Sequence, residues 1–260
     1  MSDVKKKGEV LKKENQFVFE RNDLLRACYK CNITQKRLIE MAISTIQTEK
    51  IVTLFEQKNV PIAKFKISDF TKLYGLVKTK NQKISAFNLL KNNIRTLGRA
   101  FFSTETDDYY ERINWFQSVK VSEKKDEVVF KFTDEVGDRI LELTKNYGKI
   151  NINVTKKFNS FYAAKWYDYA TSLRGMRKQF FDLSEKQIRD FMGIGNEKYK
   201  NRLNNFKANV IDKPLAELYE IDECDFFLTY QKISSDEEHC WRFYIELKNK
   251  PKTKRKSEKR

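Results

Sequence analysis

Residues 181–213, FDLSEKQIRDFMGIGNEKYKNRLNNFKANVIDK, carry a pattern that occurs twice in this chain. Phe181-Asp182-Leu183-Ser184 repeats Phe65-Lys66-Ile67-Ser68 about 116 residues later, and Lys207-Ala208-Asn209-Val210 repeats Lys91-Asn92-Asn93-Ile94 at the same offset. Each copy predicts a strand that ends at a serine, a short helix, a polar turn, a longer basic helix and a β-hairpin. This order is typical of a winged helix, and a repeat of this size indicates domain duplication rather than a solenoid.

The predicted fold class is therefore α+β, with two tandem winged-helix domains related by internal duplication. We expect a flexible charged lead at residues 1–15, a first domain at 16–148, a second domain at 149–248 and a basic disordered tail at 249–260. The boundary follows Asn146-Tyr147-Gly148, because a glycine commonly ends a helix.

Composition favours a nucleic-acid partner. Lys and Arg number 52 against 36 Asp and Glu, which gives a net charge of +16 and a pI of about 9.5. A hydrophobic content of 40% is enough to bury real cores, so the chain is not a disordered basic protein. There is no apolar run of signal-peptide or membrane-span length, which predicts a cytoplasmic protein without membrane contact.

The longer basic helix of the second copy is the best candidate for reading DNA, and we expect it to start near Tyr199. Its apolar positions, expected toward the core, are Leu203, Phe206, Val210 and Ile211. Asn can bond adenine bidentately and Lys or Arg can reach guanine or phosphate, whereas a merely solvated face normally pairs Glu with Lys. No acid lies between residues 198 and 211. The predicted DNA-binding residues are Lys198, Lys200, Asn201, Arg202, Asn204, Asn205, Lys207 and Asn209.

The first copy predicts a second DNA-contacting surface. An apolar stripe from residue 83 to about residue 99 indicates a helix with a polar opposite face. Residues 113–121 and 128–132 read as two strands whose connection forms a wing. The predicted DNA-binding residues here are Lys83, Ser85, Asn88, Lys91, Asn92 and Arg95 on the helix, and Lys124 and Lys125 on the wing. The wing of the second copy, by contrast, has an acidic tip at residues 234–238.

Local signals predict how several elements begin and end. Thr34 is expected to cap a helix, Ser68 to start the short helix of the first copy, and Ser184 to open that of the second copy with a capping box. Pro214 removes the amide that would bond the carbonyl of Val210, so the basic helix is expected to kink there or to pass into a second segment. The aromatic positions of a helix at residues 159–173 are expected in the core: Phe161, Tyr162, Trp166 and Tyr169.

Catalysis and metal binding have little support in the sequence. Cys28 and Cys31 form a C-x-x-C without a second matching pair, so we expect reduced, buried thiols and no zinc. His239 is the single histidine, which excludes a histidine pair for a metal-dependent nicking site, and no glycine-rich phosphate loop is present. The acids between residues 105 and 111 fall in a predicted loop, where nothing orders them. The sequence predicts a protein that is not an enzyme and needs no cofactor.

The chain resembles the iteron-binding plasmid replication initiators of the two-winged-helix type over about residues 20–248. The resemblance rests on Asn32-Ile33-Thr34-Gln35-Lys36-Arg37-Leu38-Ile39, on Phe161-Tyr162-Ala163 with Tyr167, and on the segment from Phe181-Asp182-Leu183-Ser184 to Val210-Ile211-Asp212-Lys213. No single motif is as specific as a catalytic signature, and the order of the motifs carries the resemblance.

The resemblance implies a function and a set of partners. Such initiators use the second winged helix as the main reader of directly repeated origin DNA, and the first adds contacts or a dimer interface. The monomer opens an AT-rich region with host initiator and replicative helicase, and a homodimer in equilibrium with it represses the protein's own promoter. The alternative is a winged-helix transcriptional regulator without replication activity, which binds a lone inverted repeat at a promoter.

Overall fold

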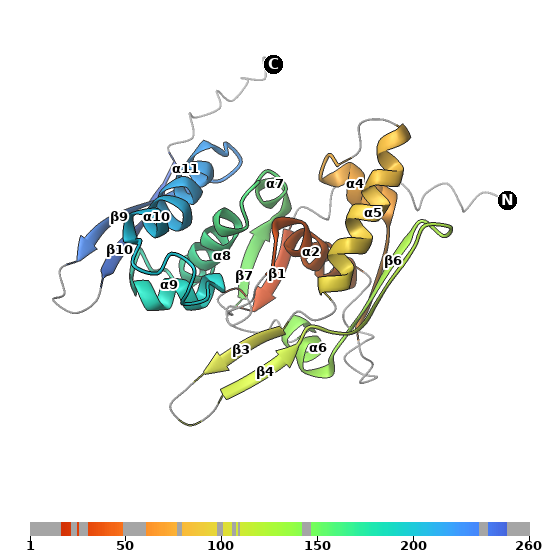
Figure 1. Ribbon diagram of the computed structural model, residues 1–260, viewed down its shortest axis with the longest axis horizontal. Helices are drawn as coiled ribbons and strands as arrows, with labels where there is room; N and C mark the ends of the chain where they lie inside the picture. The colour runs from red at the N-terminus through yellow and green to blue at the C-terminus, as the bar shows by residue number, and fades with distance from the viewer. Residues whose placement is uncertain are drawn as a thin grey trace, which may run out of the picture.

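A computed structural model describes residues 17–21, 25, 31–48, 61–76, 80–97, 101–105, 108, 110–141, 147–233 and 239–248 of the chain. We call residues 61–141 the first unit and residues 178–248 the second unit. The two units lie on either side of a central group of two strands and two helices (Figure 1). The central group consists of β1 (Phe17–Arg21), α2 (Ile33–Thr48), β7 (Tyr147–Asn151) and α8 (Phe161–Gly175).

The first unit folds as a winged helix. Its winged-helix elements in chain order are β2 (Ile62–Lys66), α4 (Ile67–Leu73), α5 (Lys80–Leu97), β5 (Phe116–Ser122) and β6 (Glu127–Phe132). The strands form an antiparallel sheet in the order β2-β6-β5, with Phe65 opposite Val128. Both of these side chains are buried, because alternate residues of the sheet face the helices.

The second unit repeats this design. Its elements are β8 (Phe180–Ser184), α9 (Glu185–Met192), α10 (Leu203–Phe206), η2 (Lys207–Asp212), α11 (Lys213–Glu220), β9 (Phe226–Ile233) and β10 (Cys240–Leu247). The sheet order is β8-β10-β9, and Phe181 lies opposite Phe243. In both units the strand before the helices pairs with the last strand of the wing. The predicted α+β fold with two winged-helix units related by duplication is confirmed.

Equivalent side chains also make equivalent contacts in the two units. Asn93 and Asn209 each donate a hydrogen bond of 2.8 Å from Nδ2 to the carbonyl four residues earlier in the helix. The next residue is buried in both copies, Ile94 in α5 and Val210 in η2. The repeat therefore preserves how the longer helix packs and not only the order of elements.

The central group takes residues from both predicted domains. β1 and β7 are antiparallel, with Val18 opposite Ile150 and Glu20 opposite Gly148. The boundary expected between residues 148 and 149 falls inside β7. Gly148, which was expected to end a helix, is instead a buried strand residue that pairs with Glu20 of β1.

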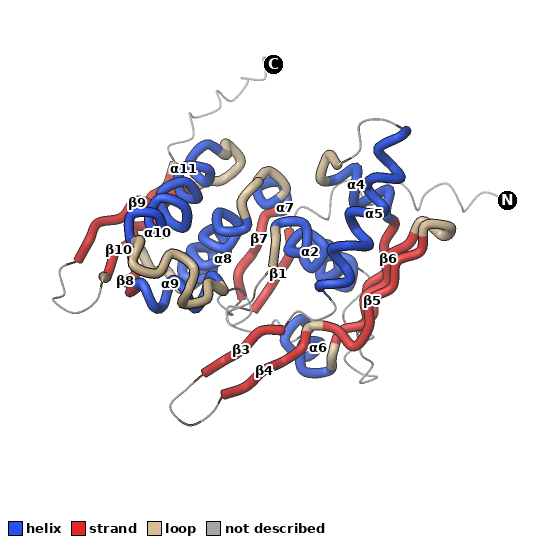
Figure 2. Tube along the Cα trace, viewed as in Figure 1, coloured by secondary structure: helices blue, strands red, loops and turns tan. Residues whose placement is uncertain are grey.

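The segment between α5 and β5 forms a hairpin where a loop was expected. β3 (Phe101–Glu105) and β4 (Tyr110–Asn114) pair antiparallel, separate from the wing of β5 and β6 (Figure 2). The Arg112 guanidinium lies 3.6 Å from the centre of the Phe101 ring, and Ile113 is buried. Glu111 forms an ion pair of 3.5 Å with Arg139 of α6 (Asp134–Leu141), so this acid is ordered in a structural contact.

Two helix starts differ from the prediction. Asn32, not Thr34, caps α2: its Oδ1 accepts a bond from the Gln35 amide, and the Gln35 side chain accepts one from the Asn32 amide, both at 2.9 Å. α4 starts at Ile67 without a side-chain cap. The Ser68 hydroxyl donates to Asp126 in the wing at 2.5 Å instead. The capping box of Ser184 with Gln187 is present as predicted.

A cluster of charged side chains is buried in the central group. Lys36 of α2 forms ion pairs with Glu40 at 2.7 Å and with Asp168 of α8 at 2.6 Å. Glu20 of β1 and Lys165 of α8 are also buried and interact electrostatically with this pair. The cluster thus contains three acids and two lysines: Glu20, Glu40 and Asp168 with Lys36 and Lys165. Burial raises the pKa of Asp168 to about 6 and that of Glu20 to about 8, so Glu20 is the acid that keeps its proton at neutral pH.

This cluster predicts a pH dependence of stability. The pKa of Glu20 is raised on folding, so the folded state binds a proton that the unfolded state releases above pH 5, and stability falls as pH rises toward 8. We expect the free energy of unfolding to drop by roughly 1 kcal/mol between pH 6.5 and pH 8, and Glu20→Gln to abolish most of that drop. Urea denaturation at both pH values measures it. The exposed control Glu123→Gln should keep the wild-type difference; an unchanged difference in Glu20→Gln contradicts the assignment.

Candidate nucleic-acid interface

The candidate reading helix is one continuous helix of three segments, α10, η2 and α11. It begins at Leu203, four residues later than expected. Tyr199 and Asn201 have left-handed backbone angles, with φ of 63° and 56°, which an α-helix does not tolerate. The predicted contacts Lys198, Lys200, Asn201 and Arg202 therefore lie in the turn that precedes the helix.

Pro214 and Trp166 shape the middle of this helix. Pro214 has no amide hydrogen, so the carbonyl of Val210 loses its partner four residues ahead. The indole Nε1 of Trp166 in α8 donates to that carbonyl at 2.7 Å. The backbone just before the proline widens into the π-helical turn η2, whose hydrogen bonds span five residues. The predicted change of helix segment at Pro214 is confirmed, and a buried tryptophan stabilises it.

The outer face of this helix is polar, as predicted. Asn204 and Asn205 are exposed, and Lys207 and Asn209 are half-buried. The residues that anchor the inner face are Phe206, Val210 and Ile211, all fully buried. Leu203, expected in the core, is only half-buried because it occupies the first turn. The helix thus presents asparagine and lysine outward from a fixed backbone.

Some of the polar side chains are already engaged within the protein. Asn209 accepts a bond from Lys213 at 2.9 Å in addition to its bond to the Asn205 carbonyl. Lys207 pairs with Asp212 at 2.9 Å, and Lys200 pairs with Glu197 at 3.1 Å. Glu197 and Asp212 thus stand at the two ends of the acid-free stretch, and each pairs with one of its lysines. The face is therefore less free than its sequence suggests.

The turn before the helix rests against α8. Lys198 donates to the Tyr162 hydroxyl at 2.9 Å, and this bond raises the pKa of Lys198. Arg189 of α9 donates to the Lys198 carbonyl at 2.7 Å and pairs with Glu185. These bonds position the turn, and with it the start of the reading helix.

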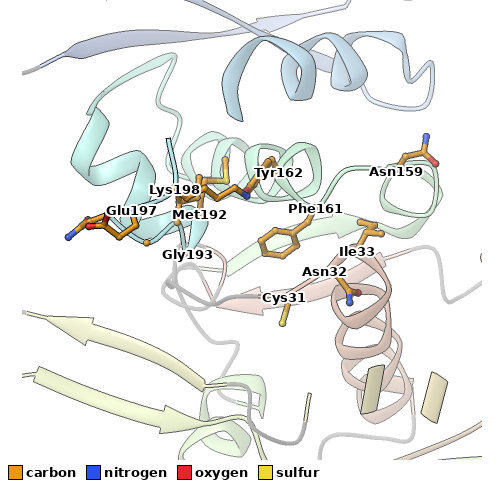
Figure 3. A pocket seen from close by; sticks show the side chains of 13 residues that line it. Cys31, Asn32, Ile33, Asn159, Phe161, Tyr162, Met192, Gly193, Glu197 and Lys198 are labelled. Carbon is orange, nitrogen blue, oxygen red and sulfur yellow. The ribbon is translucent and has the colours of Figure 1, made fainter. Parts of the chain in front are cut away.

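A cavity of about 570 Å³ lies between this turn and the start of α2. Cys31 and Asn32 line it from the central group, and Phe161 points into it from α8 (Figure 3). Glu197 and Lys198 line the opposite side. Phe161 and Tyr162, expected in the core, are half-buried: they pack against the core and also line this cavity. Trp166 is fully buried in the core, and the half-buried Tyr169 packs against the core beside Phe181 and Phe191.

The first unit presents a similar face on α5. Asn88, Lys91, Asn92 and Arg95 are exposed along it, as predicted. Lys83 and Ser85 also belong to α5, and their side chains lie outside the described residues. On the wing, Lys124 and Lys125 are exposed in the turn between β5 and β6.

Asn93 is a residue of this helix whose role the sequence did not indicate. Its Oδ1 accepts a bond of 2.7 Å from Asn32, and its carbonyl accepts one of 3.1 Å from Gln35. Gln35 also donates to Thr96 at 2.6 Å. These bonds fix α5 to the capped end of α2. The repeat places an asparagine here in both units, but the sequence does not show that only this one is buried.

The described residues contain no group of three His, Cys, Asp or Glu side chains placed to hold a metal ion. Burial raises the pKa of the Cys31 thiol to about 12, which disfavours the thiolate that zinc requires. Cys28 and the acidic wing tip at 234–238 lie outside the described residues.

We predict that the purified protein holds well under one zinc per chain. The reason is that a thiol kept protonated by burial competes poorly for the metal. Elemental analysis of protein prepared without chelator measures the content, with the double variant Cys28→Ser, Cys31→Ser as the control. Stoichiometric zinc that disappears in the double variant contradicts this prediction.

No helix among the described residues combines the length and apolarity needed to cross a membrane.

The fold is similar to the crystal structure of the Pi initiator protein in complex with iteron DNA, with a TM-score of 0.68 and 16% identity over 91% of this chain and 99% of that chain. A structure of RctB domains 2 and 3 is also similar, with a TM-score of 0.45 and 12% identity over 83% of this chain and 81% of that one. No curated protein matches the chain by sequence.

Two family models match most of the sequence. Residues 17–171 match the WH1 part of the initiator replication proteins, and residues 184–238 match the WH2 part. The first match extends through β7 and most of α8, in agreement with the pairing of β1 with β7. The chain belongs to the initiator replication protein family, with one winged helix of each type.

Proposed function

We propose that this protein initiates plasmid replication by binding directly repeated origin DNA, or iterons, with both winged-helix units. The main support is the pair of equivalent helix faces, on α5 and on α10 with η2, which present Asn, Lys and Arg outward on a chain of net charge +16. Asn and Arg read base edges in the major groove, and Lys and Arg also bind phosphate. The Pi initiator protein, which shares this fold, was crystallised with iteron DNA.

We propose that other proteins take part in the steps that follow DNA binding. Bound copies distort an adjacent AT-rich segment, and host initiator and replicative helicase join the opened DNA. A homodimer in equilibrium with the monomer binds an operator near the gene and represses it. In this scheme the protein itself contributes binding energy and DNA deformation, and no catalysis.

The first test concerns sequence reading by the second helix. Asn205→Ala removes an exposed amide from the middle of the outer face, and we expect a loss of about 1 to 3 kcal/mol on the cognate repeat with much less on random duplex. Binding isotherms on both duplexes at one salt concentration measure this. The matched control is Asn114→Ala, an exposed asparagine of β4 on the other unit. Equal losses on both duplexes assign Asn205 to phosphate contact, and no loss removes it from the interface.

The second test separates affinity from specificity through the C-terminal segment. Residues 250–260 carry seven Lys or Arg and one Glu. A deletion of this segment spares Lys248, because Lys248 donates to the Ile221 carbonyl at 2.8 Å and so belongs to the second unit. Each phosphate neutralised adds about 0.9 to the slope of log affinity against log salt, whatever the base sequence.

Removal of residues 250–260 is therefore expected to lower that slope by several units and to weaken cognate and random DNA alike. The ratio of the two affinities should remain. Titrations from low to physiological salt measure both quantities. A collapse of the ratio at an unchanged slope would show that the segment reads sequence, against the proposal.

A further inference from the structure

Lys207 and Asp212 meet because the helix is π-helical between them. In an α-helix, residues five apart point about 140° away from one another. In η2 the hydrogen bonds join residues five apart, so the two side chains come onto the same face. The Lys207 Nζ lies 3.1 Å and 2.9 Å from the two carboxylate oxygens of Asp212. Pro214 directly follows this π-helical turn, and Trp166 bonds its Val210 carbonyl.

Tyr230 of the wing completes the arrangement. Its hydroxyl donates to the carboxylate of Asp212, and its ring centre lies 5.3 Å from the Lys207 Nζ. Hydrogen bonds with Tyr230 and Asp212 raise the pKa of Lys207, so these contacts favour its charged form. Lys207 and Asp212 are 41% and 40% exposed, so a ligand can reach both. The cation is held by two partners and still faces solvent.

The described residues of the first unit do not make this contact. Lys91 occupies the place of Lys207 in the repeat, and Thr96 stands where Asp212 stands. α5 is α-helical throughout, and the Lys91 Nζ lies 6.0 Å from the ring of Phe87 in its own helix. The restraint on the lysine therefore belongs to the second unit and not to the duplicated fold.

We propose that Asp212 and Tyr230 are positioning residues that hold Lys207 at one point of the reading face and so raise the selectivity of the second unit for its cognate DNA. A free lysine binds phosphate on any sequence, which adds affinity without discrimination. A lysine held beside a carboxylate gains little from a misplaced phosphate, because the acid opposes the approach. Its ammonium is available to a base acceptor only where the cognate sequence places one. This inference rests on the proposed function.

The test uses Tyr230→Phe, which removes the hydroxyl and leaves net charge unchanged, and Asp212→Asn. The probes are the repeat that the protein protects in a footprint of the DNA flanking its gene and a random duplex of equal length, each titrated over a salt series with the full-length protein. We expect the ratio of cognate to random affinity to fall by about fivefold in Tyr230→Phe, the upper range for a partly exposed pair. In Asp212→Asn, which removes the opposing carboxylate, the salt slope on random DNA should steepen by about 0.9, since the released lysine gains one phosphate.

Two controls separate positioning from a general structural role. Tyr244→Phe changes a tyrosine of β10 that accepts a bond from Gln231 at 2.6 Å, and it should leave ratio and slope unchanged. In a Lys207→Ala background, Tyr230→Phe should have no further effect, because its action passes through Lys207. Thermal unfolding of each variant confirms that the second unit is folded.

The outcomes distinguish this inference from the proposed function. If Lys207→Ala loses cognate affinity while Tyr230→Phe and Asp212→Asn keep the wild-type ratio and slope, Lys207 reads DNA without the restraint and the inference is overturned alone. An equal effect of Tyr230→Phe with and without Lys207 also overturns it, in favour of a structural role. If the wild-type protein prefers no duplex over random DNA, the proposed function fails and the inference with it.

Discussion

The ion pair between Lys36 and Asp168 is the contact on which the arrangement of the whole molecule depends. It lies in a nearly water-free interior, where an unpaired charge is costly, so neither α2 nor α8 can move away without its partner. On the other side of α8, Trp166 bonds the Val210 carbonyl of the reading helix. One helix therefore links the buried charges of the central group to the helix that we propose binds DNA.

The two winged-helix units share a backbone design and differ in how their longer helices are supported. In the first unit, Asn93 and its neighbour Thr96 fix α5 to the end of α2. In the second, the corresponding asparagine is half-exposed, and support comes from Trp166 and the wing tyrosine Tyr230. Duplication has kept the packing of the sheet and helices, and the two copies have diverged at the polar positions around the longer helix.

The positions that could be predicted are those governed by local rules. The capping box of Ser184 and the helix change at Pro214 follow from short-range chemistry, and both are present. The cap at Asn32 was missed because Asn and Thr are both good capping residues and stand two positions apart. The late start at Leu203 was missed because Tyr199 and Asn201 adopt left-handed angles that non-glycine residues seldom take.

The sequence by itself determined the duplicated winged-helix fold, the buried stripes of the helices and the excess of positive charge, because these depend on periodicity, spacing and composition. Tertiary structure decided that residues 147–151 form a strand with residues 17–21, since strand pairing joins segments far apart in the chain. It also decided that Lys207 is held by Asp212 and Tyr230, because that contact needs a π-helical turn and a wing strand brought against it. Asp212 stands just beyond the acid-free stretch, and the π-helical turn brings its carboxylate onto the same face as Lys207.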